Sequence, residues 1–257
     1  MTENNNDVRE IVVPGEVLSD DKNFIPGRGA VRQGNKIVSI YIGLKNISGK
    51  FINVVPLRGK YRPEIGDKVI GKITDVSSVK WRVDINARDT AILKPRDAMD
   101  VYDKRSQRGG QRGGGRGGGG DRRSSREMEA ETMKKFGLGD MLIAKIMAVD
   151  RVSDPTLTTV GESLGKIKDG TIIHVDVPKI PRIIGKKGSM IKLLKDMTTC
   201  RLFMAKNGLV WIKGASPELE TLCIDAIRKI EREAHTTGLT DRIQYYIQEN
   251  KKERGLK

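Results

Sequence analysis

The chain has 257 residues, 37% of them hydrophobic, which suffices for one large domain or two to three small ones, and its net charge of +15 favours nucleic acid as a partner. Its two cysteines, Cys200 and Cys223, are too few for a disulfide framework or a common zinc site, and their apolar-periodic positions predict buried free thiols. No run approaches 18 apolar residues, and the first ten residues lack the apolar segment of a signal peptide, so we expect a soluble, cytoplasmic protein with no membrane partner.

Residues 1–62 predict a small, turn-rich β domain. The segment 11–18, IVVPGEVL, is typical of a strand that ends in a Pro-Gly turn. Residues 36–43, KIVSIYIG, alternate between an apolar face and a mixed face, which predicts one strand over the whole segment. A further strand is expected at residues 50–57, after a Ser-Gly break.

Residues 63–165 predict a second β domain, interrupted by a glycine-rich tract. Strands are expected at residues 68–76, 80–86, 90–94, 141–149 and 157–161, and a polar helix at 127–136. Three strands precede the tract and two follow it, and neither group is a plausible domain alone. Together they give five, the strand number of a small OB-type barrel. The sequence therefore predicts one barrel that carries an insertion at residues 104–126.

The insertion holds much of the positive charge. The segment 104–126 has eight basic residues against Asp121, a net charge of +7 that leaves +8 for the rest of the chain. The entropy of loop closure grows slowly with length, so a barrel tolerates such an insertion. A plain spacer would need only Gly and Ser, and the repeated arginines therefore favour an RNA-catching arm over a silent loop, with Arg108, Arg112 and Arg116 as candidate contacts.

Residues 166–257 predict an α/β domain with the order β-α-α-β-β-α. The successive segments are TIIHVDV, PRIIGKKGSMIKLLKDM, RLFMAKNGLVWIKG and SPELETLCIDAIRKIEREA, followed by a last short helix at DRIQYYIQEN. Asn207-Gly208 is a strong signal for a hairpin turn. Ser216 is expected as a helix N-cap and Pro217 at the first helical position. The fold class is therefore multidomain, mostly β plus α/β.

The segment IIGKKGSM carries the clearest binding chemistry. Two glycines separated by two residues allow a tight turn between helices and a close approach to a ligand. Free N–H groups at the start of the next helix, together with two lysines, would attract a nucleic-acid backbone. An ordinary helix-turn-helix loop is the alternative, but the β-α-α-β-β-α order favours the GxxG loop of a KH domain, which clamps about four nucleotides. The candidate contacts are Arg182, Ile184, Gly185, Lys186, Lys187 and Gly188.

The predicted barrel offers charged residues and one tryptophan. By the period of a strand, Trp81 shares a face with Val83 and Ile85, while Lys80 and Arg82 point the other way. That facing favours a core tryptophan, and a stacking platform for a base is the alternative that keeps Trp81 among the RNA-binding candidates. The basic residues expected to track an RNA backbone are Lys72, Lys80, Arg82, Arg88 and Lys94.

Catalysis finds little support in the sequence. His174 falls in a predicted strand and His235 at a helix end, and neither has a visible acid–base partner. The carboxylates are scattered, without the close grouping that two-metal hydrolysis requires. We therefore expect no catalytic residue, no metal site and no cofactor.

A small β domain, a five-stranded barrel and a KH module in this order closely resemble one family, the archaeal exosome RNA-binding cap subunits of the ribosomal-RNA-processing type. The resemblance covers nearly the whole chain. It rests on the stretches VVPGEVL, FIPGRG, GDKVIGKITDVSSVKWRVDINA, TAILKPRD and IPRIIGKKGSMI. Their combination is specific, although each piece alone is not. The arginine-glycine insertion is a departure that the family does not require.

The resemblance implies an N-terminal domain at 1–62 that docks on a hexameric ring of phosphorolytic subunits. It also implies an S1 barrel at 63–165 around the entry pore of the ring and a type I KH domain at 166–257. Three such subunits on one ring would guide RNA 3′ ends to active sites in other chains. The chain would then be a non-catalytic part of RNA degradation and processing.

Two other function classes use similar modules. A free-standing single-strand RNA-binding protein of translation or RNA chaperoning would carry the same domains without a ring partner, and co-purification in a large assembly distinguishes it from a cap subunit. A ribonuclease such as a polyribonucleotide phosphorylase fits badly. Those enzymes place KH before S1 and carry long catalytic domains for which this chain has no room.

Overall fold

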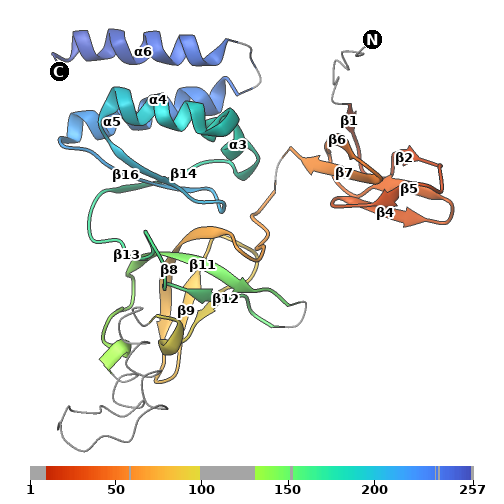
Figure 1. The fold of residues 1–257 in the computed structure, drawn as a ribbon, viewed down its shortest axis with the longest axis horizontal. Helices are drawn as coiled ribbons and strands as arrows, with labels where there is room; N and C mark the ends of the chain where they lie inside the picture. The colour runs from red at the N-terminus through yellow and green to blue at the C-terminus, as the bar shows by residue number, and fades with distance from the viewer. Residues whose placement is uncertain are drawn as a thin grey trace, which may run out of the picture. The chain divides into compact units, whose positions relative to one another are not determined.

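The computed structural model describes residues 10–57, 59–98, 131–150, 153–234, 236 and 238–255 (Figure 1). The chain forms two compact units. The first comprises Met1–Gly59 with Asp176–Pro178, and the second comprises Lys60–Val175 with Lys179–Lys257. No helix within the described residues is long and apolar enough to cross a membrane.

The first unit is built from short strands in two sheets. The strands are β1 (Ile11–Val12), β2 (Val17–Ser19), β3 (Ile25–Pro26), β4 (Ala30–Gln33), β5 (Lys36–Ser39), β6 (Gly43–Ser48) and β7 (Phe51–Pro56). One sheet has the order β1-β6-β7-β3 and the other β2-β5-β4. Its core is small and aliphatic and consists of Val12, Leu18, Ile37, Ile52 and Val54.

The single strand predicted over residues 36–43 is wrong. The chain leaves β5 after Ser39 and enters β6 of the other sheet at Gly43. The buried Ser39 hydroxyl donates a hydrogen bond to the Tyr41 carbonyl oxygen at 2.7 Å, which holds the bend between the two strands. The alternating pattern does not reveal this change of sheet, because the apolar residues continue through the bend.

The predicted five-stranded barrel is confirmed. Its strands are β8 (Lys68–Val76), β9 (Trp81–Asp84), β10 (Ala91–Leu93), β11 (Met141–Ala148) and β12 (Thr156–Thr158), with a short β13 (Gly165–Lys166) at the edge. The sheet order is β12-β10-β9-β8-β11-β13, and an added pairing of β12 with β11 closes the barrel. Closure leaves five strands around one core, as in OB-type barrels.

The predicted insertion lies between β10 and β11. A 3₁₀ turn, Pro95–Asp97, follows β10, and residues 131–133 are helical before the chain enters β11. The two flanks meet, because the Lys135 Nζ donates to the Ala98 carbonyl oxygen at 3.1 Å. Residues 99–130, with the first four residues of the expected helix at 127–136, lie outside the described range, and residues 134–136 are not helical. Three strands before the tract and two after it therefore share one barrel.

The remaining elements form an α/β domain, called here the GxxG domain. They are β14 (Thr171–His174), a 3₁₀ turn (Val177–Lys179), α3 (Ile180–Ile184), a second 3₁₀ turn (Lys186–Gly188), α4 (Ser189–Thr198), β15 (Arg201–Met204), β16 (Leu209–Lys213), α5 (Pro217–Arg232) and α6 (Leu239–Glu253). The sheet order is β14-β16-β15, all antiparallel. The predicted β-α-α-β-β-α order is confirmed, and the last helix is longer than expected.

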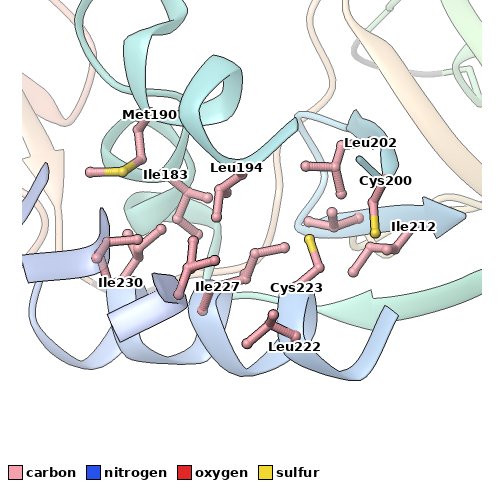
Figure 2. Packing of buried hydrophobic residues seen from close by; sticks show 14 of the residues in the cluster. Ile183, Met190, Leu194, Cys200, Leu202, Ile212, Leu222, Cys223, Ile227 and Ile230 are labelled. Atoms are coloured by element: carbon pink, nitrogen blue, oxygen red, sulfur yellow. The ribbon is translucent and has the colours of Figure 1, made fainter. Parts of the chain in front are cut away.

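The core of the GxxG domain lies between its sheet and its helices (Figure 2). The Ser216 side chain accepts a hydrogen bond from the Leu219 N–H at 3.4 Å, which confirms the predicted N-cap of α5. The apolar stripe of α5 is buried along its length. Cys200 and Cys223 are free and buried in this core, as predicted. The hydrogen bond with Cys200 and burial both raise the pKa of Cys223.

The barrel and the GxxG domain pack against each other within the second unit. Ile70 of β8 and Ile143 of β11 face out of the barrel, and both are buried against Ala205 and its neighbours on the GxxG sheet. Phe203 and Trp211 add to the same cluster. The face of the GxxG sheet opposite the helices is therefore covered by the barrel.

Candidate nucleic-acid interface

The GxxG loop forms as predicted between α3 and α4. Gly185 has φ +76°, and a Cβ there would lie 2.7 Å from the Met190 backbone nitrogen, so the loop passes too close to α4 for any side chain. Gly188 has φ +80°, and a Cβ there would make only an ordinary contact of 3.7 Å with the Ile191 side chain, so only its backbone conformation favours glycine. Lys186 and Lys187 are exposed at the tip.

The start of α4 is only partly free to bind an anion. No side chain caps its first turn, but the Gly188 and Ser189 N–H groups already donate to the Gly185 and Lys186 carbonyl oxygens within the loop. The positive end of the helix dipole and the two tip lysines keep the electrostatic potential positive here. Contacts of this kind to phosphates position a strand and carry no information about its bases.

An open pocket of about 420 Å³ lies beside the loop, toward the start of α6. Arg182 and Lys186 line it, together with Ser189 and Asp241. The Arg182 guanidinium donates to the Thr236 carbonyl oxygen at 2.6 Å. This hydrogen bond ties the Arg182 side chain to the segment that precedes α6. The pocket wall carries both signs of charge, because Asp241 also lines it.

The apolar residues on either side of the GxxG loop divide into two groups. Ile183 and Leu194 are fully buried and belong to the core. Ile184 and Ile191 are half-buried. Only this second pair retains surface for contact with a base beside the GxxG loop.

Trp81 lies in the core of the barrel and has no exposed surface. Its ring meets the Phe136 ring edge to face, with centroids 5.4 Å apart, and its Nε1 donates to the Phe136 carbonyl oxygen at 3.2 Å. A base cannot stack on a fully covered ring. The stacking alternative for Trp81 is wrong, and the core alternative that the strand period favours holds.

The basic residues of the barrel are spread along its outer face. Lys72 and Arg82 are exposed, but the ladder places Lys72 opposite Asp84 and Arg82 opposite Asp75. Lys80 precedes β9, whereas the exposed Arg88 follows its other end. Lys94 is exposed just after β10. The fold thus leaves these side chains outward, but it does not bring them together at one point.

The tract arginines Arg108, Arg112 and Arg116 lie outside the described residues, as does His235. His174 is exposed, and its Nε2 lies 3.0 Å from the Asn86 Nδ2 at the junction of the barrel and the GxxG domain. Among the described residues, no group of three or more His, Cys, Asp or Glu side chains could hold a metal ion.

Asn207 has a structural role that the sequence reading missed. Its side chain is fully buried and donates to two barrel carbonyl oxygens, those of Ile70 at 2.6 Å and Ile85 at 2.7 Å. Its own carbonyl oxygen accepts from the Asn86 Nδ2 at 2.8 Å. The sequence holds no separate signal for this role, because a hairpin turn alone is enough to account for the Asn-Gly pair.

Family models match all three parts of the chain. They are the exosome RNA binding protein RRP4 N-terminal domain over residues 9–58, the RRP4 S1 domain over 60–108 and a KH domain over 170–232. The S1 match ends at residue 108, within the segment 99–130 that the structure does not describe. The barrel itself continues after that segment to β12.

Curated relatives match over most of the chain. The exosome complex component Rrp4 of Pyrococcus furiosus is 40% identical over 253 residues, which cover 96% of this chain and 87% of the relative. That of Methanothermobacter thermautotrophicus is 39% identical over 92% of this chain and 67% of the relative. A crystal structure whose description assigns it to the exosome as an RNA-binding protein is 35% identical, with a TM-score of 0.59 over 76% of this chain and 99% of that one. With three matching domain models in the same order and identities near 40% along nearly its whole length, the chain belongs to the Rrp4 family of exosome complex components.

Proposed function

We propose that this chain is a non-catalytic RNA-binding cap component of the exosome. It binds RNA and guides 3′ ends into a hexameric phosphorolytic 3′–5′ exoribonuclease ring, three caps to a ring, in cytoplasmic RNA degradation and processing. The observation that carries the proposal is the presence of all three Rrp4-type domains in one chain with a fully formed GxxG loop.

The three domains divide this work at the boundaries 1–62, 63–165 and 166–257. The N-terminal domain docks on the ring, and the outer face of the β1-β6-β7-β3 sheet supports that role. Ile11, Leu44 and Val55 form one cross-strand row on this face, and Phe51 is 50% exposed in the same sheet. A contiguous exposed apolar face is typical of a protein-docking surface.

The barrel and the GxxG domain hold the RNA. Lysine and arginine contacts to phosphates give salt-sensitive binding that tolerates many sequences, and the half-buried Ile184 adds a modest base contact. The tract arginines extend this surface as an RNA-catching arm. Deletion of residues 105–126 is therefore expected to leave folding and ring assembly intact and to lower RNA affinity. A misfolded deletion variant would contradict the prediction that the tract is an insertion in the barrel.

Two measurements on the full chain test the proposal. Native mass spectrometry of the tagged protein from its own cells is expected to show a large assembly, and a monomer would favour a free-standing RNA-binding protein. Binding of a fluorescent single-stranded RNA is expected to weaken in Lys186→Asp/Lys187→Asp. The matched control, Lys22→Asp/Lys36→Asp, changes two exposed lysines of the first unit by the same charge and is expected to bind like the wild type.

A further inference from the structure

Three lysines from distant parts of the sequence meet where the barrel joins the GxxG domain. Lys68 of β8 lies directly opposite Lys145 of β11 in the antiparallel ladder, and both side chains are exposed. The next pair on the same face, Ile70 and Ile143, is buried under the GxxG domain. The exposed Lys206 is tied to this point, because its backbone nitrogen donates to the Lys68 carbonyl oxygen at 3.1 Å. We call Lys68, Lys145 and Lys206 the seam lysines.

Lys68 and Lys145 repel each other in the unliganded protein. Directly opposite residues of an antiparallel pair have Cβ atoms about 4.5–5.5 Å apart, and like charges at such positions destabilise a sheet. No carboxylate within the described parts of the chain forms an ion pair with any of the three seam lysines. Positive charge concentrated without a partner indicates an external anion that relieves the repulsion.

The chain path places this anion site beside the GxxG loop. α4 begins at the loop, ends at Thr198 and is followed after a short turn by β15, which packs against it. Because the chain reverses there, the end of β15 at Met204 returns toward the level of the loop. Lys206 follows two residues later. A strand held at the GxxG loop therefore meets the seam lysines when it continues toward the barrel.

We infer that the seam lysines bind successive phosphates of single-stranded RNA as it crosses from the GxxG loop to the barrel. This inference rests on the proposed RNA-binding function. The buried cluster and the Asn207 hydrogen bonds join the two domains, so the loop and the seam form one extended phosphate-binding surface. A KH groove holds about four nucleotides, and the seam therefore adds affinity mainly for longer strands.

The first test measures the affinity of the full chain for a fluorescein-labelled 20-nucleotide single-stranded RNA over a range of salt concentrations. We expect Lys68→Gln/Lys145→Gln/Lys206→Gln to bind about 10- to 100-fold more weakly at about 0.1 M salt. Each lost phosphate contact lowers the slope of log affinity against log salt by about 0.7 for single strands, so the slope should fall by about 2. The loss should be smaller for a 4-nucleotide RNA.

A matched variant removes the same charge elsewhere. Lys22→Gln/Lys36→Gln/Lys50→Gln changes three exposed lysines of the first unit and is expected to keep the wild-type affinity and slope. Equal binding by the seam variant and this control would overturn the inference. The GxxG variant Lys186→Asp/Lys187→Asp then separates the two proposals. If it still weakens binding, the RNA-binding function stands without the seam, and if it does not, the RNA-binding function itself fails.

The second test needs no RNA affinity. Removal of one member of the opposed pair, as in Lys145→Gln, should relieve the repulsion and raise the thermal midpoint of the unliganded protein by about 1–3 °C. Amine acetylation read by mass spectrometry gives a direct view of the wild type. RNA should protect the seam lysines but not Lys22 or Lys36, and equal labelling with and without RNA would contradict the site.

Discussion

The Asn207 side-chain amide of the GxxG domain donates a hydrogen bond of 2.6 Å to the carbonyl oxygen of Ile70 in the barrel, across 137 residues of sequence. A second donation reaches Ile85 at 2.7 Å. Asn207 has no solvent-exposed surface, so both carbonyl groups depend on it inside the interface. A buried polar group that satisfies two others fixes how the two domains meet, because a shifted arrangement would leave all of them unpaired.

Replacement of Asn207 by alanine should therefore uncouple the barrel from the GxxG domain. Two buried carbonyl oxygens lose a donor, and we expect a loss of about 2–4 kcal/mol in the free energy of unfolding. Urea unfolding followed by tryptophan fluorescence should change from one transition to two. Asn207→Asp should be at least as harmful, since a carboxylate cannot donate to a carbonyl oxygen.

The control for Asn207 is an exposed asparagine of the first unit. Asn46→Ala should change the free energy of unfolding by about 0.5 kcal/mol or less. A single, unshifted transition in Asn207→Ala would show that apolar contacts alone hold the two domains together.

Trp81 offers a second test, because core and RNA-contact roles predict opposite results. Trp81→Leu removes the edge-to-face contact with Phe136 and the hydrogen bond to its carbonyl oxygen. We expect the variant to lose about 2–4 kcal/mol of stability. Its RNA affinity, measured under conditions where it remains folded, should stay unchanged. A loss of about 1–3 kcal/mol in binding free energy with unchanged stability would restore the stacking role.

Much of the fold could be predicted because its local signals agree. The Ser216 cap, the Asn207-Gly208 hairpin turn and the two glycines of the loop each act within a few residues, and all three appear where the sequence places them. The number of strands on both sides of the tract predicts the barrel. The break after Ser39 is not predictable in this way, because an apolar run does not show which sheet each half joins.

The candidate interface was less predictable where it depends on distant contacts. The period of β9 gives the outward direction of Arg82, but not that Asp75 lies opposite. Nor does any local pattern bring Lys68, Lys145 and Lys206 together. Such neighbours follow from the register of the ladders and from the packing of domains, and only the folded chain supplies them.

Asp140, which directly precedes β11, should make the stability of the protein depend on pH. The ion pair with Lys166 and the hydrogen bond from the Gly137 N–H, 2.8 Å long, lower the pKa of its carboxyl group. A depressed folded-state pKa contributes stability above the unfolded pKa of about 4, and that contribution is lost as pH falls through the folded value.

The comparison of wild type and Asp140→Asn measures this contribution. Because the Asp140 side chain is 24% exposed, we expect a difference of only about 1 kcal/mol or less at pH 7. The difference should shrink as the pH falls below about 4. The exposed Asp89, changed to Asn as a control, should show no such trend. A difference that stays constant with pH would mean that the ionised form of Asp140 contributes nothing to folding.

The two glycines of the loop should respond differently to alanine, because only one of them lacks space. In Gly185→Ala the new Cβ would lie 2.7 Å from the Met190 nitrogen, so the loop or α4 must move. We expect the free energy of unfolding to fall by about 3 kcal/mol or more, and RNA affinity to fall as well. Gly188→Ala meets no such contact and should lose only the cost of its positive φ, about 1–2 kcal/mol. The control is Gly34 of the first unit, which has φ +60° and open surroundings. Gly34→Ala should lose about as much stability as Gly188→Ala and should keep the wild-type RNA affinity.

Equal stability of the Gly185 and Gly188 variants would mean that the loop adjusts without strain. The close approach of the loop to α4 would then not be what positions the two lysines.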